Sequence, residues 1–160
     1  MASELSGADG GLASERVRSL LEQIAAAAGL TATIEVSEDE EQIRAAFTGE
    51  DLGILIGRGG QTIDAIQHLA YRIAFRGSDA RKDLLVDAGG YRGRRAVGLR
   101  AAADQAAEAA VRDGRPVPLE PMSAIERKLV HEHLRTRRDV ETYSEGEEPD
   151  RRLVVAPLVG

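Results

Sequence analysis

The 160-residue sequence contains no cysteine, and this absence excludes several classes of protein at once. Without a thiol there is no disulfide framework, no thiolate metal site and no cysteine nucleophile, so zinc fingers and cysteine-dependent enzymes are ruled out. Aromatic residues make up only 3% of the chain. A core must therefore be built from Leu, Ile, Val and Ala, and extended base stacking on aromatic side chains is not expected.

Long apolar runs are also missing. No stretch approaches the roughly 20 apolar residues that a membrane-spanning helix needs, and the first residues lack both the basic region and the apolar run of a signal peptide. We therefore expect a cytoplasmic protein. Residues 1–12, in which Ser, Gly, Ala and Asp dominate, are expected to form a disordered tail.

Lysine is scarce as well: of the 21 basic residues only Lys82 and Lys128 are lysines. Arginine suits bidentate phosphate contacts, although a base-composition bias in the coding DNA explains the excess equally well. The formal net charge of -6 argues, taken alone, against a nucleic-acid partner. The charges are segregated, however, because acids dominate residues 35–51 and 139–150 whereas bases gather over residues 92–100 and 127–138.

The hydrophobic pattern predicts an α+β protein. Its first half has the order αββααβ, and a change of domain is expected between Gly89 and Gly93. Ser123, with Glu126 three residues later, predicts a capping box at the start of the last helix. Helices are expected over residues 14–28, with Ser14 as the cap, and over 61–75, 91–111 and 122–134. A short helical segment is expected over 51–56, and strands are expected over 31–36, 42–47, 84–87, 116–119, 140–143 and 153–155.

A glycine-rich loop, Gly57-Arg58-Gly59-Gly60, separates the short helical segment from the helix that starts at Gln61. Glycines allow a close approach of the backbone to a phosphate, and the N-terminus of the following helix favours an anion. A Walker loop is excluded because its G-x-x-x-x-G-K-[ST] pattern is missing, and a dinucleotide fingerprint lacks its third glycine. An isolated loop of this kind is more often a tight turn between two helices.

The sequence around the loop, residues 52–73, strongly resembles the KH domain, in which a G-x-x-G loop clamps single-stranded RNA backbone. The αββααβ order matches the type II arrangement of that domain. The resemblance makes Gly57 and Gly60 the defining glycines, and Arg58 and Gly59 the variable positions, with Arg58 supplying the phosphate charge. Four apolar residues would line the groove or the core beneath it, and for each we favour the core: Ile54, Ile56, Ile63 and Ile66.

A second pair of candidate residues, Arg127 and His131, is four apart on a predicted helix, which places both side chains within reach of one ligand. An isolated R-x-x-x-H pattern is usually an exposed helix face. Here residues 120–134 and 140–157 closely resemble the R-x-x-x-H (R-three-H) domain, which is associated with single-stranded nucleic acid. Arginines in the first turns of the helix over 91–111 oppose its dipole and hint at an anionic ligand; Arg92, Arg94 and Arg95 are the expected supporting residues.

The order of these two domains resembles the Jag-type bacterial RNA-binding proteins, with the KH domain over residues 13–90 and the small α/β R-x-x-x-H domain over 91–160. The resemblance implies a protein that binds single-stranded RNA and acts as a post-transcriptional regulator linked to cell elongation or envelope growth. It also implies partnership with a small KH-only protein or self-association. No cofactor and no metal ion are expected.

An enzyme and a protein-interaction scaffold are the two alternatives to RNA binding. An enzyme is disfavoured because His131 and His133 have the wrong spacing for one helix face, and both the H-E-x-x-H and G-x-S-x-G patterns are missing. A protein-interaction scaffold, which would use the KH fold for dimerisation and have little direct RNA affinity, stays open because the net charge favours it.

Overall fold

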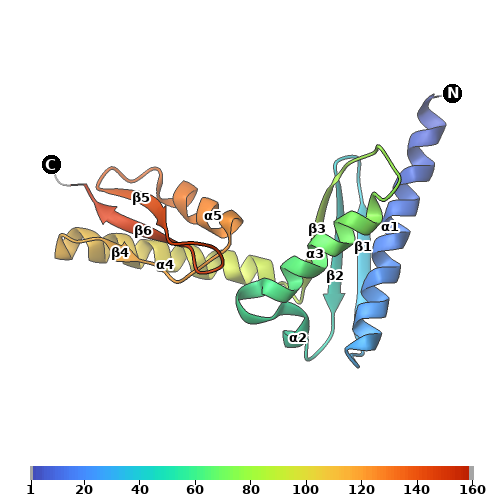
Figure 1. The fold of residues 1–160 in the computed structure, drawn as a ribbon, viewed down its shortest axis with the longest axis horizontal. Coiled ribbons are helices and arrows are strands. Elements are labelled where there is room, and N and C mark those ends of the chain that lie inside the picture. Colours follow the sequence, from blue (N-terminus) through green and yellow to red (C-terminus); the bar gives the residue numbers. More distant parts are fainter. Residues whose placement is uncertain (1, 159–160) are drawn as a thin grey trace. The chain divides into compact units, whose positions relative to one another are not determined.

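The computed structural model describes residues 2–158, with side chains from residue 11 onward. The chain divides into two compact units, residues 1–91 and 92–160, each with its own hydrophobic core. Each unit combines helices with a three-stranded sheet (Figure 1), so the predicted α+β class is confirmed. The division lies inside the segment from Gly89 to Gly93 where the sequence predicts a change of domain.

The first unit has the predicted αββααβ order. β1 pairs antiparallel with β2, and β2 pairs parallel with β3, so the sheet order is β1-β2-β3. Phe47 of β2 lies opposite Ile34 on one side and Ala88 on the other. The elements are α1 (Ala2–Ala27), β1 (Thr33–Glu38), β2 (Gln42–Thr48), α2 (Gly53–Ile56), the 3-10 turn η1 (Arg58–Gly60), α3 (Gln61–Ala74) and β3 (Asp83–Ala88).

The core of the first unit lies between this sheet and the helices α1 and α3. Side chains of a strand alternate between its two faces, and in β2 every second residue, Ile43, Ala45 and Phe47, is buried. On α3 the buried positions Ile63 and Ile66 recur at helical spacing and point to the same face. The same hydrophobic cluster contains Val17, Leu21 and Ala25 of α1, Ala70 and Ala74 of α3, and Leu84, Val86 and Ala88 of β3.

The N-terminal segment differs from the sequence expectation. α1 begins at Ala2, so most of the predicted disordered tail over residues 1–12 is helical. Once a helix is nucleated each further residue adds a hydrogen bond at low cost, and Ala, Glu and Leu in this segment have good helix propensity. Ser14, which the sequence places at the helix cap, lies inside α1, and its hydroxyl donates a hydrogen bond to the Glu38 carboxylate.

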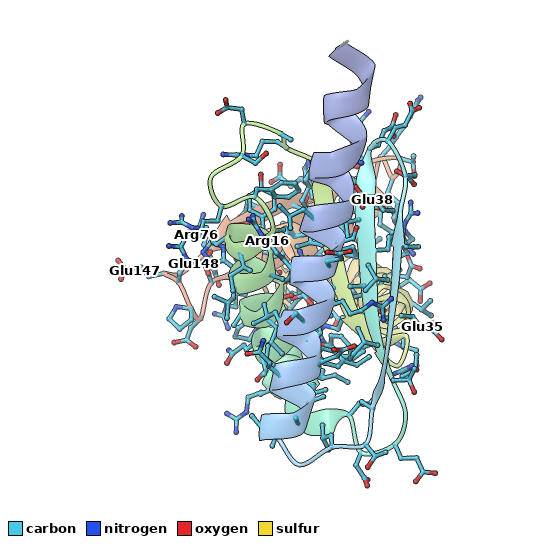
Figure 2. All side chains as sticks on the ribbon, turned by 90° about the vertical axis from the view of Figure 1, so that its right-hand side faces the viewer. Arg16, Glu35, Glu38, Arg76, Glu147 and Glu148 are labelled. Atoms are coloured by element: carbon cyan, nitrogen blue, oxygen red, sulfur yellow. The ribbon has the colours of Figure 1, made fainter. Side chains whose placement is uncertain are left out.

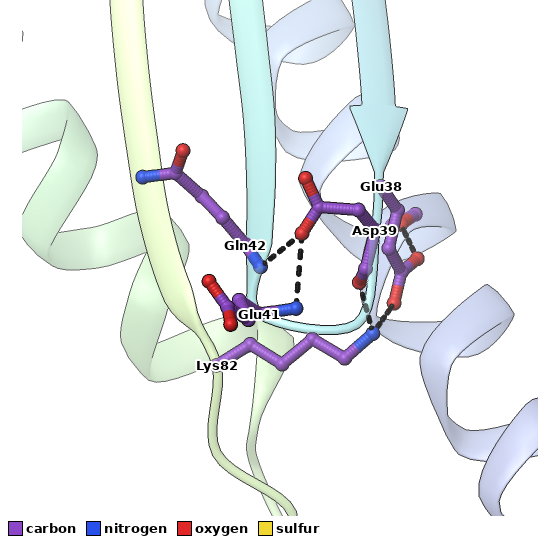
Figure 3. A network of polar contacts seen from close by, with 6 residues as sticks. Glu38, Asp39, Glu41, Gln42 and Lys82 are labelled. Atoms are coloured by element: carbon purple, nitrogen blue, oxygen red, sulfur yellow. Dashed lines mark hydrogen bonds and ion pairs between the residues drawn. The ribbon is translucent and has the colours of Figure 1, made fainter.

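The Glu38 carboxylate joins three segments that are far apart in the sequence. It accepts hydrogen bonds from Ser14 of α1 and from Lys82, whose Nζ lies 2.8 Å from Glu38 Oε1 and 2.7 Å from the backbone oxygen of Asp39 (Figure 3). The neighbouring Asp39 carboxylate accepts from the backbone N–H groups of Glu41 and Gln42. These contacts fix the turn between β1 and β2 and attach it to α1 and to the start of β3.

This arrangement predicts a pH dependence of stability. Burial raises the pKa of Glu38, but the hydrogen bonds from Lys82 and Ser14 outweigh it, so the pKa lies below its ordinary value of 4.5. A depressed pKa adds stability above the unfolded value, and this contribution is lost as the pH falls through the folded value. At pH 7 we expect Glu38→Gln to destabilise the protein by about 1 kcal/mol.

The difference between Glu38→Gln and wild type is expected to shrink below pH ~4, as the wild-type carboxyl takes up its proton. Thermal unfolding followed by circular dichroism across this pH range measures it. Glu40→Gln, at an exposed position of the same turn, is the matched control and should be nearly neutral throughout. A constant difference between wild type and Glu38→Gln at every pH would contradict the assignment.

Arg16 ties α1 to the end of α3. Its guanidinium donates to the backbone oxygens of Ala74 and Arg76, at 3.3 and 3.0 Å, and Figure 2 shows Arg16 and Arg76 in this region. The last carbonyl groups of a helix have no partner within it. Arg16 therefore satisfies acceptors at the C-terminal end of α3 and fixes the helix that follows the glycine loop.

The second unit packs two helices on one face of an antiparallel sheet with the order β4-β6-β5. The central strand β6 has four consecutive buried residues, of which Leu153 and Val155 belong to the core shared with the two helices. Alanines of the long helix α4 lie against Val130 and Leu134 of α5 and Val155 of β6. The elements are α4 (Tyr91–Asp113), β4 (Val117–Pro118), α5 (Ala124–Leu134), β5 (Val140–Glu145) and β6 (Arg152–Pro157).

The start of α5 has the predicted capping box. The Ser123 hydroxyl accepts a hydrogen bond from the backbone N–H of Glu126, and the Glu126 carboxylate accepts from the backbone N–H of Ser123 at 3.0 Å. Both donors are N–H groups that the helix itself leaves without acceptors.

Within residues 2–158, no helix combines the length and the apolar character that crossing a membrane requires.

Candidate nucleic-acid interface

The glycine loop joins α2 to α3 through backbone conformations that glycine alone adopts readily. Gly57 has φ 73° and ψ 178°, Gly59 has φ 59° and Gly60 has φ 81°. The Gly57 N–H donates to the Gly53 oxygen and ends α2, and the Gly60 N–H donates to the Gly57 oxygen. The chain thus turns between two helices within four residues, and the second helix begins directly after the loop.

The three glycines differ in what surrounds them. A Cβ at Gly57 would lie 2.2 Å from Thr62 Oγ1, and a Cβ at Gly60 would lie 2.8 Å from the ring of Tyr91. A Cβ at Gly59 would have nothing within 4 Å. Gly57 and Gly60 are therefore required by packing inside the unit, whereas the backbone at Gly59 borders open space that another molecule can enter.

Arg58 is the charged residue of the loop, and its side chain is exposed. Over residues 2–158 no hydrogen bond or ion pair engages its guanidinium, which leaves all five donors for solvent or a ligand. The N-terminal turn of α3 follows directly and adds a partial positive charge. Asp64 in that turn is an acid with a partner of its own. The loop offers an anion one guanidinium and an accessible stretch of backbone.

The apolar residues near the loop divide between core and surface. Ile63 and Ile66 are buried as predicted, and Ile56 is half-buried. Ile54, for which the core was favoured, is 62% exposed. α2 is a single turn in which Leu55 is buried and Ile56 packs partly against the same core. Ile54 is therefore an exposed apolar side chain three residues before the loop.

Arg127 and His131 both lie on α5, but only His131 is exposed. The Arg127 residue is 8% exposed, and its guanidinium donates to the Met122 oxygen at 2.7 Å and to Glu148 Oε1 at 2.6 Å. Residues four apart on a helix are offset by about 40° around its axis, and this offset turns Arg127 inward beside Val130. Arg127 and His131 therefore do not share one exposed face of α5.

His131 is held by the sheet rather than by Arg127. Its Nδ1 lies 2.5 Å from Thr142 Oγ1 of β5. A hydroxyl can donate to or accept from an imidazole nitrogen, so this contact persists in either protonation state and leaves Nε2 for another partner. Glu148 (labelled in Figure 2) and Thr142 are the two partners that the sequence did not reveal, since each lies on a segment more than ten residues from the helix position it contacts.

The predicted supporting arginines occupy the first turns of α4. Arg94 is exposed, Arg92 is half-buried, and both have interactions within the protein. Arg95 pairs with Glu126 of the capping box, with Nε 2.8 Å from Oε1. This ion pair makes Arg95 part of the α4 to α5 packing. Across residues 2–158, no three His, Asp or Glu side chains gather closely enough to hold a metal ion.

Comparison with known proteins assigns both units. The model described as "KhpA/KhpB, KH domain" matches residues 14–86, and the model of the R-three-H domain matches residues 98–157. Proteins named RNA-binding protein KhpB are similar over most of the chain. The relative from Clostridium symbiosum is 36% identical over 124 residues, and the one from Lactiplantibacillus plantarum is 36% identical over 128 residues.

The alignments cover 78% and 80% of this chain but only 56% and 40% of those two relatives, so the chain spans about half of their length. The relative from Bacillus subtilis is 32% identical over 144 residues, which cover 89% of this chain and 69% of the relative. The protein is therefore one with a KH domain followed by an R-three-H domain. It belongs to the KhpB family. These relatives are named as RNA-binding proteins, and their names mention no enzymatic activity.

Proposed function

We propose that the protein binds single-stranded RNA, and that the loop from Gly57 to Gly60 contacts the RNA backbone. The names of its relatives support RNA as the ligand. The observation that carries the proposed site is the contrast within the loop. Gly57 and Gly60 are packed against the protein, whereas Gly59 borders open space and the neighbouring Arg58 is exposed.

In this binding mode Arg58 pairs with a phosphate oxygen, and the backbone at Gly59 approaches the strand without a side chain in between. The exposed Ile54 offers an apolar surface to an adjacent base. On the second unit the proposed contacts are His131 and the exposed Arg94. Arg92 and Arg95 complete the predicted supporting set, and Arg95 acts through its ion pair with Glu126. Arg127 supports this surface through its ion pair with Glu148 rather than by touching the RNA.

The test compares RNA affinity of wild type with that of Arg58→Asp/Gly59→Asp by fluorescence anisotropy, using a labelled pool of short single-stranded RNAs of random sequence. Both acids repel phosphate, so we expect binding to weaken by about tenfold or more. The substitutions should leave the fold intact, because Asp tolerates left-handed φ values and nothing lies within 4 Å of a Cβ at Gly59.

Arg58→Asn/Gly59→Asn is the matched control, since Asn has the shape of Asp and the same tolerance for left-handed φ but carries no charge. It should bind RNA better than the Asp pair. Raising the salt concentration should weaken wild-type binding with a log-log slope of about -0.7 for each phosphate contacted. Equal affinity of wild type and the Asp variant, with a flat salt dependence, would instead favour the protein-interaction scaffold.

We further propose, from the family resemblance, that the protein is a cytoplasmic post-transcriptional regulator with a role in cell elongation or envelope growth. Its proposed protein partner is a small KH-only protein or a second copy of itself. The family model that matches residues 14–86 is named for both KhpA and KhpB.

A further inference from the structure

The burial of Arg127 raises the question of which cations on the second unit are available to RNA. Both terminal nitrogens of its guanidinium are engaged, one by the Met122 oxygen and the other by Glu148. The Arg127 side chain is 10% exposed. A phosphate could reach this guanidinium only by displacing the Glu148 carboxylate, and little of the Arg127 side chain is open to solvent. Arg127 therefore stabilises this unit and is poorly placed to contact a ligand.

The exposed face of α5 carries a different set of cations. Lys128 and His131 lie on α5, and Arg135 is the residue that caps its C-terminal end with helical backbone angles. The three are spaced by three and four residues, so they follow one another along a single side of the helix. All three are exposed. Within the described part of the chain, the side chains of Lys128 and Arg135 take part in no hydrogen bond and no ion pair. We call these three residues the α5 basic stripe.

The charges around the α5 basic stripe leave it positive. Two neighbouring arginines are neutralised by acids. Arg127 pairs with Glu148, and Arg137 pairs with Asp139, with Nη2 of the arginine 2.7 Å from Oδ2 of the aspartate. Glu132 is an exposed acid on the same helix. Arg138, beyond the end of α5, is exposed and offsets it. The potential over this surface is therefore set by Lys128 and Arg135.

Geometry within the stripe suits an extended polyanion. A rise of about 1.5 Å per residue separates Lys128 and Arg135 by about 10 Å along the helix axis, so each can reach its own phosphate. Between them, the contact of Nδ1 with Thr142 restrains the His131 ring. Its Nε2 is left for a third contact, as a donor when that nitrogen carries a proton.

We propose that Lys128, His131 and Arg135 form the phosphate-contacting site of the second unit, and that Arg127 is a structural residue. This inference rests on the proposed function, because it presupposes that the protein binds single-stranded RNA. It moves the contact from the Arg127/His131 pair to a stripe that shares only His131 with it.

The test measures affinity for the same random single-stranded RNA pool over a range of salt concentrations, with the full chain. In Lys128→Gln/Arg135→Gln we expect about tenfold weaker binding at low salt and a log-log slope shallower by about 1.4, for two lost phosphate contacts. Arg112→Gln/Arg115→Gln is the matched control: it removes the same charge from exposed positions at the far end of α4, and should leave the slope unchanged.

Each outcome separates the two proposals. A shallower salt dependence of RNA affinity in the stripe variant, but not in the control, supports the inference. Wild-type affinity and slope in the stripe variant, with wild type binding RNA normally, would overturn this inference and leave the proposed function standing. An equal loss of RNA affinity in the stripe variant and the control would mean that the effect comes from net charge, and this would also overturn the inference. If wild type does not bind the pool, both proposals fail.

Discussion

Gly57→Ala is expected to destabilise the first unit by about 3 kcal/mol, as the sum of backbone strain and a steric clash. With φ 73° and ψ 178°, Gly57 lies in a region that residues with a Cβ almost never occupy. The new methyl group would also lie 2.2 Å from Thr62 Oγ1, 2.9 Å from Thr62 Cβ and 3.0 Å from the Thr62 nitrogen. Rotation of the threonine side chain removes only the first of these contacts.

Urea unfolding followed by circular dichroism measures the change. Gly59→Ala is the matched control, because it adds the same methyl group two residues away, where nothing lies within 4 Å. The control should lose only about 1 kcal/mol, from the left-handed φ. Equal losses in the two variants would mean that packing against Thr62 contributes nothing to the choice of glycine at position 57.

Arg127→Ala is expected to destabilise the second unit by about 2 kcal/mol, because it leaves the Met122 oxygen without its charged donor in a buried position. Loss of the Glu148 partner adds little, since the Glu148 side chain is 58% exposed and can be hydrated. Arg127→Lys should recover only part of the loss, because one ammonium group cannot reproduce both guanidinium contacts.

Hydrogen exchange measured by mass spectrometry localises this effect. We expect faster exchange in α5 and in the turn between β5 and β6 of Arg127→Ala, with α1 and α3 unchanged. Lys128→Ala, at the exposed neighbouring position, should change stability by less than about 0.5 kcal/mol. Should Arg127→Ala prove as stable as Lys128→Ala, the buried contacts would not be what holds the turn to the helix.

The predictions that succeeded from sequence depend on short-range patterns. The capping box of Ser123 and Glu126 is a local arrangement of two residues on one turn. The buried positions Ile63 and Ile66 follow from helical periodicity alone. The turn at Gly57 to Gly60 likewise follows from glycine content, because few other residues adopt its φ values. In each case the residues that decide the structure are neighbours in the chain.

The positions where the structure differs from the sequence expectation depend on contacts between residues far apart in the chain. Arg127 is buried with its guanidinium on the Met122 oxygen and on Glu148, which comes from a turn 21 residues later, and no pattern in the helix encodes these contacts. Ser14 was taken for a helix cap because its true acceptor, Glu38, belongs to a different element. Ile54 is predicted to lie in the core, but Leu55 and in part Ile56 occupy the inward positions of this single helical turn. Tertiary partners decide these positions.

The two lysines of the chain occupy opposite chemical environments. Lys82 Nζ is bonded to Glu38 and to the Asp39 oxygen, and its side chain is 23% exposed. Lys128 is exposed on α5. An amine is nucleophilic only when it is unprotonated and accessible, so an amine-directed reagent or an acetyl donor meets one shielded ammonium and one free one. Because Lys82 and Lys128 are the two lysines of the sequence, acylation of lysine side chains reports mainly on Lys128, beside the surface where we place the RNA backbone.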